Sequence, residues 1–268
     1  MKADLFDITG KKLKQIELPS QFNEEVRPDL IKRAVLVVQS NDRQAYGSHP
    51  HAGERASADI SKRRKSFKTS YGHGISRTPR KSLWRRGTQF GWVGAVAPQT
   101  RKGRKSHPPK ATKIWSQKIN IKERRKAIRS ALSAAMNKDI VLSHGHLFNE
   151  FPLIIEDKFE SINKSKEVIN ILNNLGLEKE LERCSIRKVR AGKGKNRARK
   201  YRKRKGPLIV VSKESPLVKA ALNIPGIDVS IVNNLNAELL APGTMPGRLT
   251  IFTESAIEKL KKENLFNK

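Results

Sequence analysis

The chain alternates between two hydrophobic periods over most of its length. Short apolar runs bounded by turn residues predict strands at 3–7, 152–155, 208–211, 228–232 and 249–252. Apolar residues at helical spacing predict helices at 121–136, 164–175, 215–222, 235–240 and 254–262. Buried strands that alternate with helices indicate an α/β fold, with a mostly parallel sheet and helices on both faces in a Rossmann-like three-layer arrangement.

The helix at 121–136 has the clearest start signal. Asn120 can cap it, because an Asn side chain accepts a hydrogen bond from a free backbone N–H of the first turn. Glu123 follows three residues later, as in a capping box. We therefore expect this helix to begin directly after Asn120.

Residues 27–42 fit two kinds of element. The apolar run at 34–38 is rich in valine and is typical of a buried strand. However, the apolar residues between 30 and 38 also share one helical face, and Pro28 suits a first helical turn. We favour a helix here.

Residues 43–113, which we call the long basic loop, follow neither period. They hold 8 of the 17 glycines. Loops beyond about 12–15 residues are uncommon in compact domains and are usually functional or disordered. The sequence therefore predicts a globular α/β domain made of 1–42 and 114–268, with an extended, non-globular loop at 43–113 inserted into it.

Charge divides the chain in the same way. The formal net charge is +31, of which the long basic loop carries +16. Residues 183–205, the short basic segment within the globular part, carry +13 and no acidic residue. The remaining chain is nearly neutral. Charge concentrated in this way repels itself and indicates a polyanionic partner.

Nucleic acid suits this charge better than a membrane surface. A membrane-bound helix needs basic and apolar faces on one continuous helix, whereas the long basic loop is interrupted by glycine and proline and the short basic segment has few apolar residues. In the long basic loop, aromatic residues lie between the basic runs. Cations neutralise phosphates, and aromatic rings stack on unpaired bases, so we favour folded RNA over duplex DNA. A disordered, solvated loop and, for the short basic segment, a localisation signal are the simpler alternatives.

The candidate RNA contacts are the cations and aromatic residues of both basic parts. In the long basic loop they are Arg55, Lys62, Arg63, Arg64, Lys65, Lys68, Tyr71, Arg77, Arg80, Lys81, Trp84, Arg85, Arg86, Phe90, Trp92, Arg101, Lys102, Arg104 and Lys105. In the short basic segment they are Arg190, Lys193, Lys195, Arg197, Arg199, Lys200, Arg202, Lys203 and Arg204.

No catalytic motif is recognisable in the sequence. The segments after the predicted strands lack the glycines of a phosphate-binding turn, so we expect no cofactor. The pairs His49/His51 and His144/His146 offer too few ligands for a zinc site and are interpreted as loop histidines. Cys184 is interpreted as an inert residue at a helix end. We therefore expect a protein that is not an enzyme, binds no metal and has no membrane span. We also expect a cytoplasmic location, since a single cysteine favours a reducing compartment. An RNA-modifying enzyme and a chromatin-type DNA-binding protein are the competing hypotheses.

Several motifs resemble those of one known family. The longest is Arg190-Ala-Gly-Lys-Gly-Lys-Asn-Arg-Ala-Arg-Lys-Tyr201, which continues through 204–208. Others lie at 71–74, 77–80, 97–98, 105–109, 223–227, 240–243 and 247–248. Their content and order resemble the universal large-subunit ribosomal protein four family in its archaeal and eukaryotic form, along essentially the whole chain.

The resemblance implies a structural protein of the large ribosomal subunit that binds large-subunit rRNA early in assembly. Its partners would be that rRNA, neighbouring large-subunit proteins and, near the loop tip, the nascent chain in the polypeptide exit tunnel. The tip motif departs from the family's usual pattern, because His73 and Ile75 stand where threonine and arginine are common. The tip candidates carried over are Gly72, His73, Gly74, Arg77 and Arg80.

Overall fold

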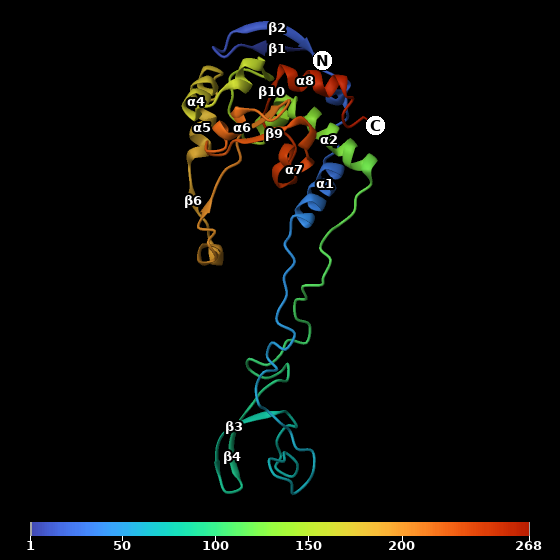
Figure 1. Ribbon diagram of the computed structural model, residues 1–268, viewed down its shortest axis with the longest axis vertical. Coiled ribbons are helices and arrows are strands. Elements are labelled where there is room, and N and C mark those ends of the chain that lie inside the picture. Colours follow the sequence, from blue (N-terminus) through green and yellow to red (C-terminus); the bar gives the residue numbers. More distant parts are fainter. Residues whose placement is uncertain (1, 268) are drawn as a thin grey trace. The chain divides into compact units, whose positions relative to one another are not determined.

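A computed structural model describes residues 2–267, and Figure 1 shows the order of its elements. The strands are β1 (Lys2–Phe6), β2 (Lys12–Glu17), β3 (Arg80–Arg86), β4 (Gln89–Gly94), β5 (Leu153–Ile155), β6 (Lys188–Val189), β7 (Tyr201–Arg202), β8 (Leu208–Val211), β9 (Asp228–Ile231) and β10 (Thr250–Thr253). The α-helices are α1 (Pro28–Asn41), α2 (Ile121–Ala135), α3 (Lys138–Ser143), α4 (Ser165–Asn174), α5 (Glu178–Ser185), α6 (Pro216–Ala221), α7 (Ala237–Leu240) and α8 (Glu254–Lys262). None of the helices within 2–267 is long and apolar enough to cross a membrane.

A mixed six-stranded sheet forms the centre of the fold. Its strand order is β2-β1-β5-β10-β8-β9, and the five strands from β1 to β9 in that order run parallel. Only β2 is antiparallel, and it forms a charged edge beside β1. The mostly parallel α/β fold is confirmed. The strand order differs from the 3-2-1-4-5-6 order of dinucleotide-binding domains, so the likeness to a Rossmann fold is limited to the layers.

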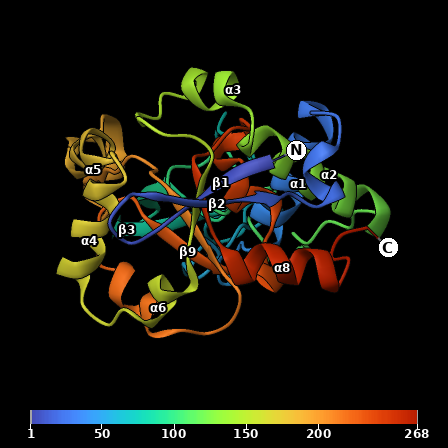
Figure 2. The ribbon, with the colours of Figure 1, turned by 90° about the horizontal axis from the view of Figure 1, so that it is seen from above.

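Two apolar clusters cover the two faces of the sheet. Alternate residues of one strand enter different clusters, because side chains in a strand point to opposite faces. Ile154 of β5 packs in the cluster with α1, α2 and α8, whereas Leu153 and Ile155 pack in the cluster with α4 and α6. Figure 2 shows these two sets of helices on different sides of the sheet. The central strands β5 and β8 are therefore apolar at every position.

The two helical assignments made from local detail are both confirmed. Residues 28–41 form α1, with Pro28 at its start and Ile31, Ala34 and Val35 buried. Helical periodicity therefore outweighs the β propensity of the valines. The Asn120 side chain caps α2 by accepting a hydrogen bond from the Lys122 N–H at 3.1 Å. The expected capping box is not completed among the described residues, because the Glu123 carboxylate pairs with Arg33 of α1 at 3.3 Å rather than with the Asn120 N–H.

Two compact units make up the chain. One, which we call the body, consists of 1–42 and 116–268; the other, the loop unit, is 43–115. The chain leaves the body after α1 and re-enters it close to the same place, because the Gln117 N–H donates to Asn41 Oδ1 at 2.8 Å. The ends of the inserted segment are thus held together by the body itself.

The loop unit has structure of its own. β3 and β4 form an antiparallel hairpin with a two-residue turn at Gly87 and Thr88. Thr69, Ser70 and Ala95 are buried within the unit. The hairpin was not predicted, and the loop is therefore not extended throughout.

Replacing 43–115 by a short Gly/Ser linker should leave the body folded, because the hydrogen bond between Asn41 and Gln117 already brings the cut ends together. We expect the melting temperature in circular dichroism to stay within about 4 °C of the full chain, roughly the shift that 1 kcal/mol gives in a domain of this size. As a control, Leu132→Ala in the shortened chain should destabilise it by about 2–5 kcal/mol, since Leu132 is fully buried. Non-cooperative melting of the shortened chain would show that the loop unit belongs to the core.

Candidate nucleic-acid interface

The short basic segment is a small projecting ribbon. β6 and β7 pair antiparallel, with Lys188 opposite Arg202, and the chain between them contains a 3-10 turn at Gly192–Arg197. The nine candidate contacts from Arg190 to Arg204 are all exposed. None of them forms an ion pair with a carboxylate of the described chain, so their charges are available to a partner.

A buried ion network holds the first end of this segment. The Glu180 carboxylate on α5 accepts hydrogen bonds from Arg183 Nη2 at 2.6 Å, His146 Nδ1 at 2.6 Å and the Leu147 N–H at 3.1 Å. Burial acts to raise the pKa of Glu180, but the bonds from Arg183 and His146 outweigh it, and the pKa lies below its ordinary value. Glu180 is therefore ionised at neutral pH, and Arg183 is fixed against it.

The same guanidinium reaches the other end of the segment. Arg183 Nη2 also donates to the Lys205 carbonyl at 2.8 Å. Both ends of the ribbon are therefore held by one side chain of α5. The pairing of Glu180 with Arg183 is local, but the clamp as a whole could not be read from the sequence, because His146 lies 34 positions from Glu180 and Lys205 lies 22 positions from Arg183.

Arg248, just before β10, fixes the exit of the segment into the sheet. Its fully buried guanidinium donates to the carbonyls of Gly206 at 2.8 Å and Leu239 at 3.0 Å. It also lies 2.6 Å from the Asp228 carboxylate, which Lys205 contacts at 2.8 Å. Burial acts to raise the pKa of Asp228, but Lys205 and Arg248 lower it overall. Asp228 thus neutralises the buried Arg248 at this edge of the sheet.

Cys184 packs at the point where the segment begins and ends. A Cβ added at Gly206 would lie 2.5 Å from the Cys184 Sγ, and one at Gly226 would lie 2.8 Å from the Cys184 Cβ. Burial raises the pKa of the Cys184 thiol to about 11. The interpretation of Cys184 as an inert residue at a helix end agrees with this position in the last turn of α5.

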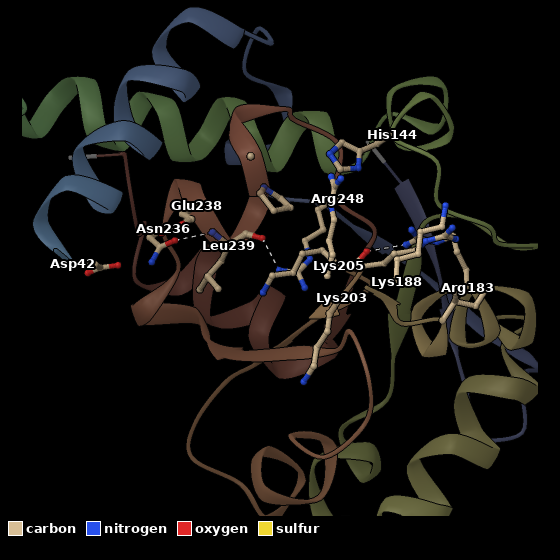
Figure 3. A pocket seen from close by; sticks show the side chains of 15 residues that line it. Asp42, His144, Arg183, Lys188, Lys203, Lys205, Asn236, Glu238, Leu239 and Arg248 are labelled. Atoms are coloured by element: carbon tan, nitrogen blue, oxygen red, sulfur yellow. Dashed lines mark hydrogen bonds between the residues drawn. The ribbon is translucent and has the colours of Figure 1, made fainter. Parts of the chain in front are cut away.

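A pocket of about 740 Å³ lies between the ribbon and α7. Figure 3 shows Lys188 and Arg183 on one side of it and Asn236 and Leu239 on the other. Four of its cations have no carboxylate partner within the described residues; they are Lys188, Arg202, Lys203 and Arg204. The pocket therefore presents free positive charge next to the neutralised Arg183 and Arg248.

His144 lines this pocket, and its ring stacks on His146 with centroids 5.4 Å apart. Burial lowers the pKa of His144. His146 is a buried member of the Glu180 network rather than a simple loop histidine. Within residues 2–267, no three His, Cys, Asp or Glu side chains gather in a way that could hold a metal ion.

Cations of the loop unit are mostly exposed. The exceptions among the candidates are Lys68 and Arg80, which are half-buried. Glu54 lies 3.5 Å from Arg104 and pairs with it. Most of the remaining positive charge of the unit has no counter-charge within the described chain. At the predicted tip, Gly72 and Gly74 have φ of +81° and +65°, and a Cβ on either would meet no neighbour. Backbone conformation, rather than crowding, therefore favours glycine at the tip.

Most of the predicted base-stacking rings already contact other parts of the loop unit. Phe90 contacts Phe67 and Trp92, each with centroids 5.2 Å apart. The Arg85 guanidinium lies 4.7 Å from the Phe67 centroid, and Arg77 lies 5.0 Å from the Tyr71 centroid. These rings stabilise the loop unit, a role that the sequence did not reveal.

Comparison with known proteins decides the family. Residues 16–263 match the model of the "Ribosomal protein L4/L1 family". The chain belongs to the ribosomal protein L4/L1 family. It is 52% identical over 267 residues to "Large ribosomal subunit protein uL4" of Nanoarchaeum equitans, covering 99% of this chain and 100% of that protein. The protein of the same name from Archaeoglobus fulgidus is 44% identical over 262 residues, covering 97% of this chain and 98% of its own length.

Membership in the L4/L1 family confirms the resemblance inferred from the motifs. Proteins of this family are structural constituents rather than enzymes, so the expectation of a non-enzymatic protein is confirmed as well. The match from residue 16 to residue 263 includes the long basic loop, the short basic segment and the Arg248 network. The basic segments are therefore parts of the family's own domain and not additions to it.

The Glu180 network should make the stability of this L4/L1-family protein depend on pH. A carboxyl pKa that lies below 4.5 in the folded state stabilises the fold above pH 4.5, and this contribution is lost as the pH falls through the folded pKa. Glu180→Gln should therefore lower the free energy of unfolding by about 3–5 kcal/mol at pH 7, measured with urea. The difference from the unsubstituted protein should narrow at pH 3. Glu182→Gln, an exposed position on the same helix, is the control and should have little effect. A difference that does not change with pH would contradict the network.

Cys184 should react slowly with a thiol reagent such as Ellman's reagent. Its pKa of about 11 leaves little thiolate at pH 8, and the side chain is buried. We expect the native protein to react at least about 100-fold more slowly than the same protein unfolded in urea. Rapid, stoichiometric labelling of the native protein would show that Cys184 does not pack against Gly206 and Gly226.

Proposed function

We propose that this protein is a structural constituent of the large ribosomal subunit in the cytoplasm, where it binds large-subunit rRNA early in assembly. The observation that carries the proposal is the match over nearly the full length to large-subunit proteins. The distribution of charge supports the same conclusion, because a nearly neutral body carries two cationic segments. Binding is thus assigned to these segments rather than to the body as a whole.

The short basic segment would contact rRNA phosphates with its exposed cations. Its ribbon is held at both ends by Arg183, Arg248 and Asp228, so its charges are presented on a fixed base. Ordering the backbone of this segment on binding therefore costs less than it would in a free tail. The free cations beside the pocket, Lys188 and Lys203 among them, extend this contact surface.

The long basic loop would enter the rRNA, with its tip at the wall of the polypeptide exit tunnel. The resemblance of 71–80 to the family's loop-tip motif supports this part. The exposed tip residues Gly72, His73, Gly74 and Arg77, together with the half-buried Arg80, are the candidates for contacts near the nascent chain. Neighbouring large-subunit proteins are the remaining proposed partners.

Binding to large-subunit rRNA should weaken steeply with salt. Ten phosphate contacts would give a slope of log K against log[salt] of roughly −7 to −9. Replacing Lys193, Lys195 and Arg197 by alanine should make the slope shallower by about 2–3, since each contact contributes about 0.7–0.9. Lys166→Ala on α4, outside the basic segments, serves as the control and should leave the slope unchanged. Filter binding measures these values, with duplex DNA as competitor; a flat salt response or a preference for duplex DNA would contradict the proposal.

A further inference from the structure

One aromatic ring of the loop unit differs from all the others. The unit contains seven aromatic residues, and six of them have an aromatic or cationic partner within the described chain. Trp84 has none. Its side chain is nevertheless large and apolar, and the residue is 57% exposed. An accessible indole with no ring or cation partner, on a strongly cationic unit, is a candidate for stacking on a nucleic-acid base.

The hairpin holds this ring in place. Trp84 on β3 pairs with Gly91 on β4, across a register shift between Ser82 and Trp84. A Cβ at Gly91 would overlap Nε1, Cε2 and Cδ1 of the indole, all of which belong to its five-membered ring. The ring therefore lies over the bare backbone of Gly91, an arrangement that only glycine permits. One side of the indole is supported by the protein, and much of the rest is accessible.

The surroundings of Trp84 favour a nucleotide as the ligand. The ring borders a pocket of about 740 Å³ that is also lined by Lys65, Lys68, Thr88 and Gln89. The two lysines can contact a phosphate, and the threonine and glutamine side chains can donate to or accept from a base edge. Arg85 and Arg86, which follow Trp84 in the strand, add to the positive charge.

We propose that Trp84 is a stacking platform for an unpaired RNA base, and that Phe67, Tyr71, Phe90 and Trp92 serve the internal packing of the loop unit. The proposal rests on the proposed rRNA binding and makes it specific, because it assigns recognition of a base to one ring. A stacked base needs an accessible aromatic face near phosphate-binding cations, and Trp84 meets both conditions. The preference would extend to any base, because every base has a π-face.

The test compares two single-stranded decamers with the full-length protein. One is oligoadenylate, and the other is an abasic chain of the same length, so both carry the same phosphates. We expect the protein to prefer oligoadenylate, and Trp84→Ala to weaken that binding by about 5- to 140-fold, the change equivalent to about 1–3 kcal/mol for one stacked base. Binding of the abasic chain should stay unchanged. Fluorescence anisotropy measures both.

Three further variants make the outcome decisive. Trp84→Phe should keep most of the preference, since an aromatic face remains. Gly91→Ala should lose it although the indole is still present, because the added Cβ displaces the ring. Leu83→Ala should change nothing; Leu83 is 67% exposed, directly precedes Trp84 and carries no ring. Near-ultraviolet circular dichroism checks that each variant keeps the packed rings of the hairpin.

Two results would overturn the proposal. If Trp84→Ala retains the full preference for oligoadenylate, the ring does not stack on a base. Its exposed face is then assigned to contact with a protein partner. If Trp84→Ala weakens the binding of both decamers equally, Trp84 acts through the fold of the hairpin. Neither result concerns the salt dependence of rRNA binding, so the proposed function can stand when this inference fails.

Discussion

The buried guanidinium of Arg248 is the interaction that connects the sheet with the cationic surface. It bonds to carbonyls at the entrance of β8 and the end of α7, and it pairs with Asp228 at the start of β9. Arg248 itself lies two residues before the start of β10. A buried arginine is costly unless its charge is paired and its donors are satisfied, and here both conditions are met by groups at the start of β8, in α7 and in β9. The place where the short basic segment enters the sheet is consequently fixed in space.

The second constraint is electrostatic. A protein with a net charge of +31 must hold like charges close together without unfolding. The structure separates the cations that stabilise the fold from those that are left free. Arg183, Lys205 and Arg248 are paired with Glu180 or Asp228 at the base of the ribbon, whereas the cations farther along it have no carboxylate partner within 2–267. Self-repulsion is therefore concentrated in segments whose charge an RNA would neutralise.

The parts of the fold that the sequence predicted are those with strong local signals. Residues 208–211 form β8 with the bounds expected, because a strand that is buried on both faces is apolar at every position. Asn120 caps α2 for a reason that lies within three residues of sequence. Edge strand β2 was missed, since its exposed face is mostly charged and its apolar content is low.

The hairpin in the loop unit was missed for a different reason. The register shift beside Trp84 interrupts the alternation of side chains. None of the aligned cross-strand pairs joins two large apolar side chains, and one of them, Arg85 with Phe90, joins a cation to a ring. The network around Glu180 and Arg248 could not be predicted from the sequence either, because it joins segments that are far apart in the chain. For the proposed binding surface, the sequence named the candidate cations, but only the structure separates a ring with no partner from rings that pack internally.

The small packed core of the loop unit has a consequence for the cost of assembly. Fixing the backbone of a fully disordered residue costs about 1–2 kcal/mol of conformational entropy, and a partner that orders a long flexible segment must supply that free energy at the moment of binding. In this protein the hairpin and the rings around Phe90 have already restricted part of the segment. An RNA bound as proposed would therefore have less of the segment to order, and more of the interaction free energy would be retained as affinity.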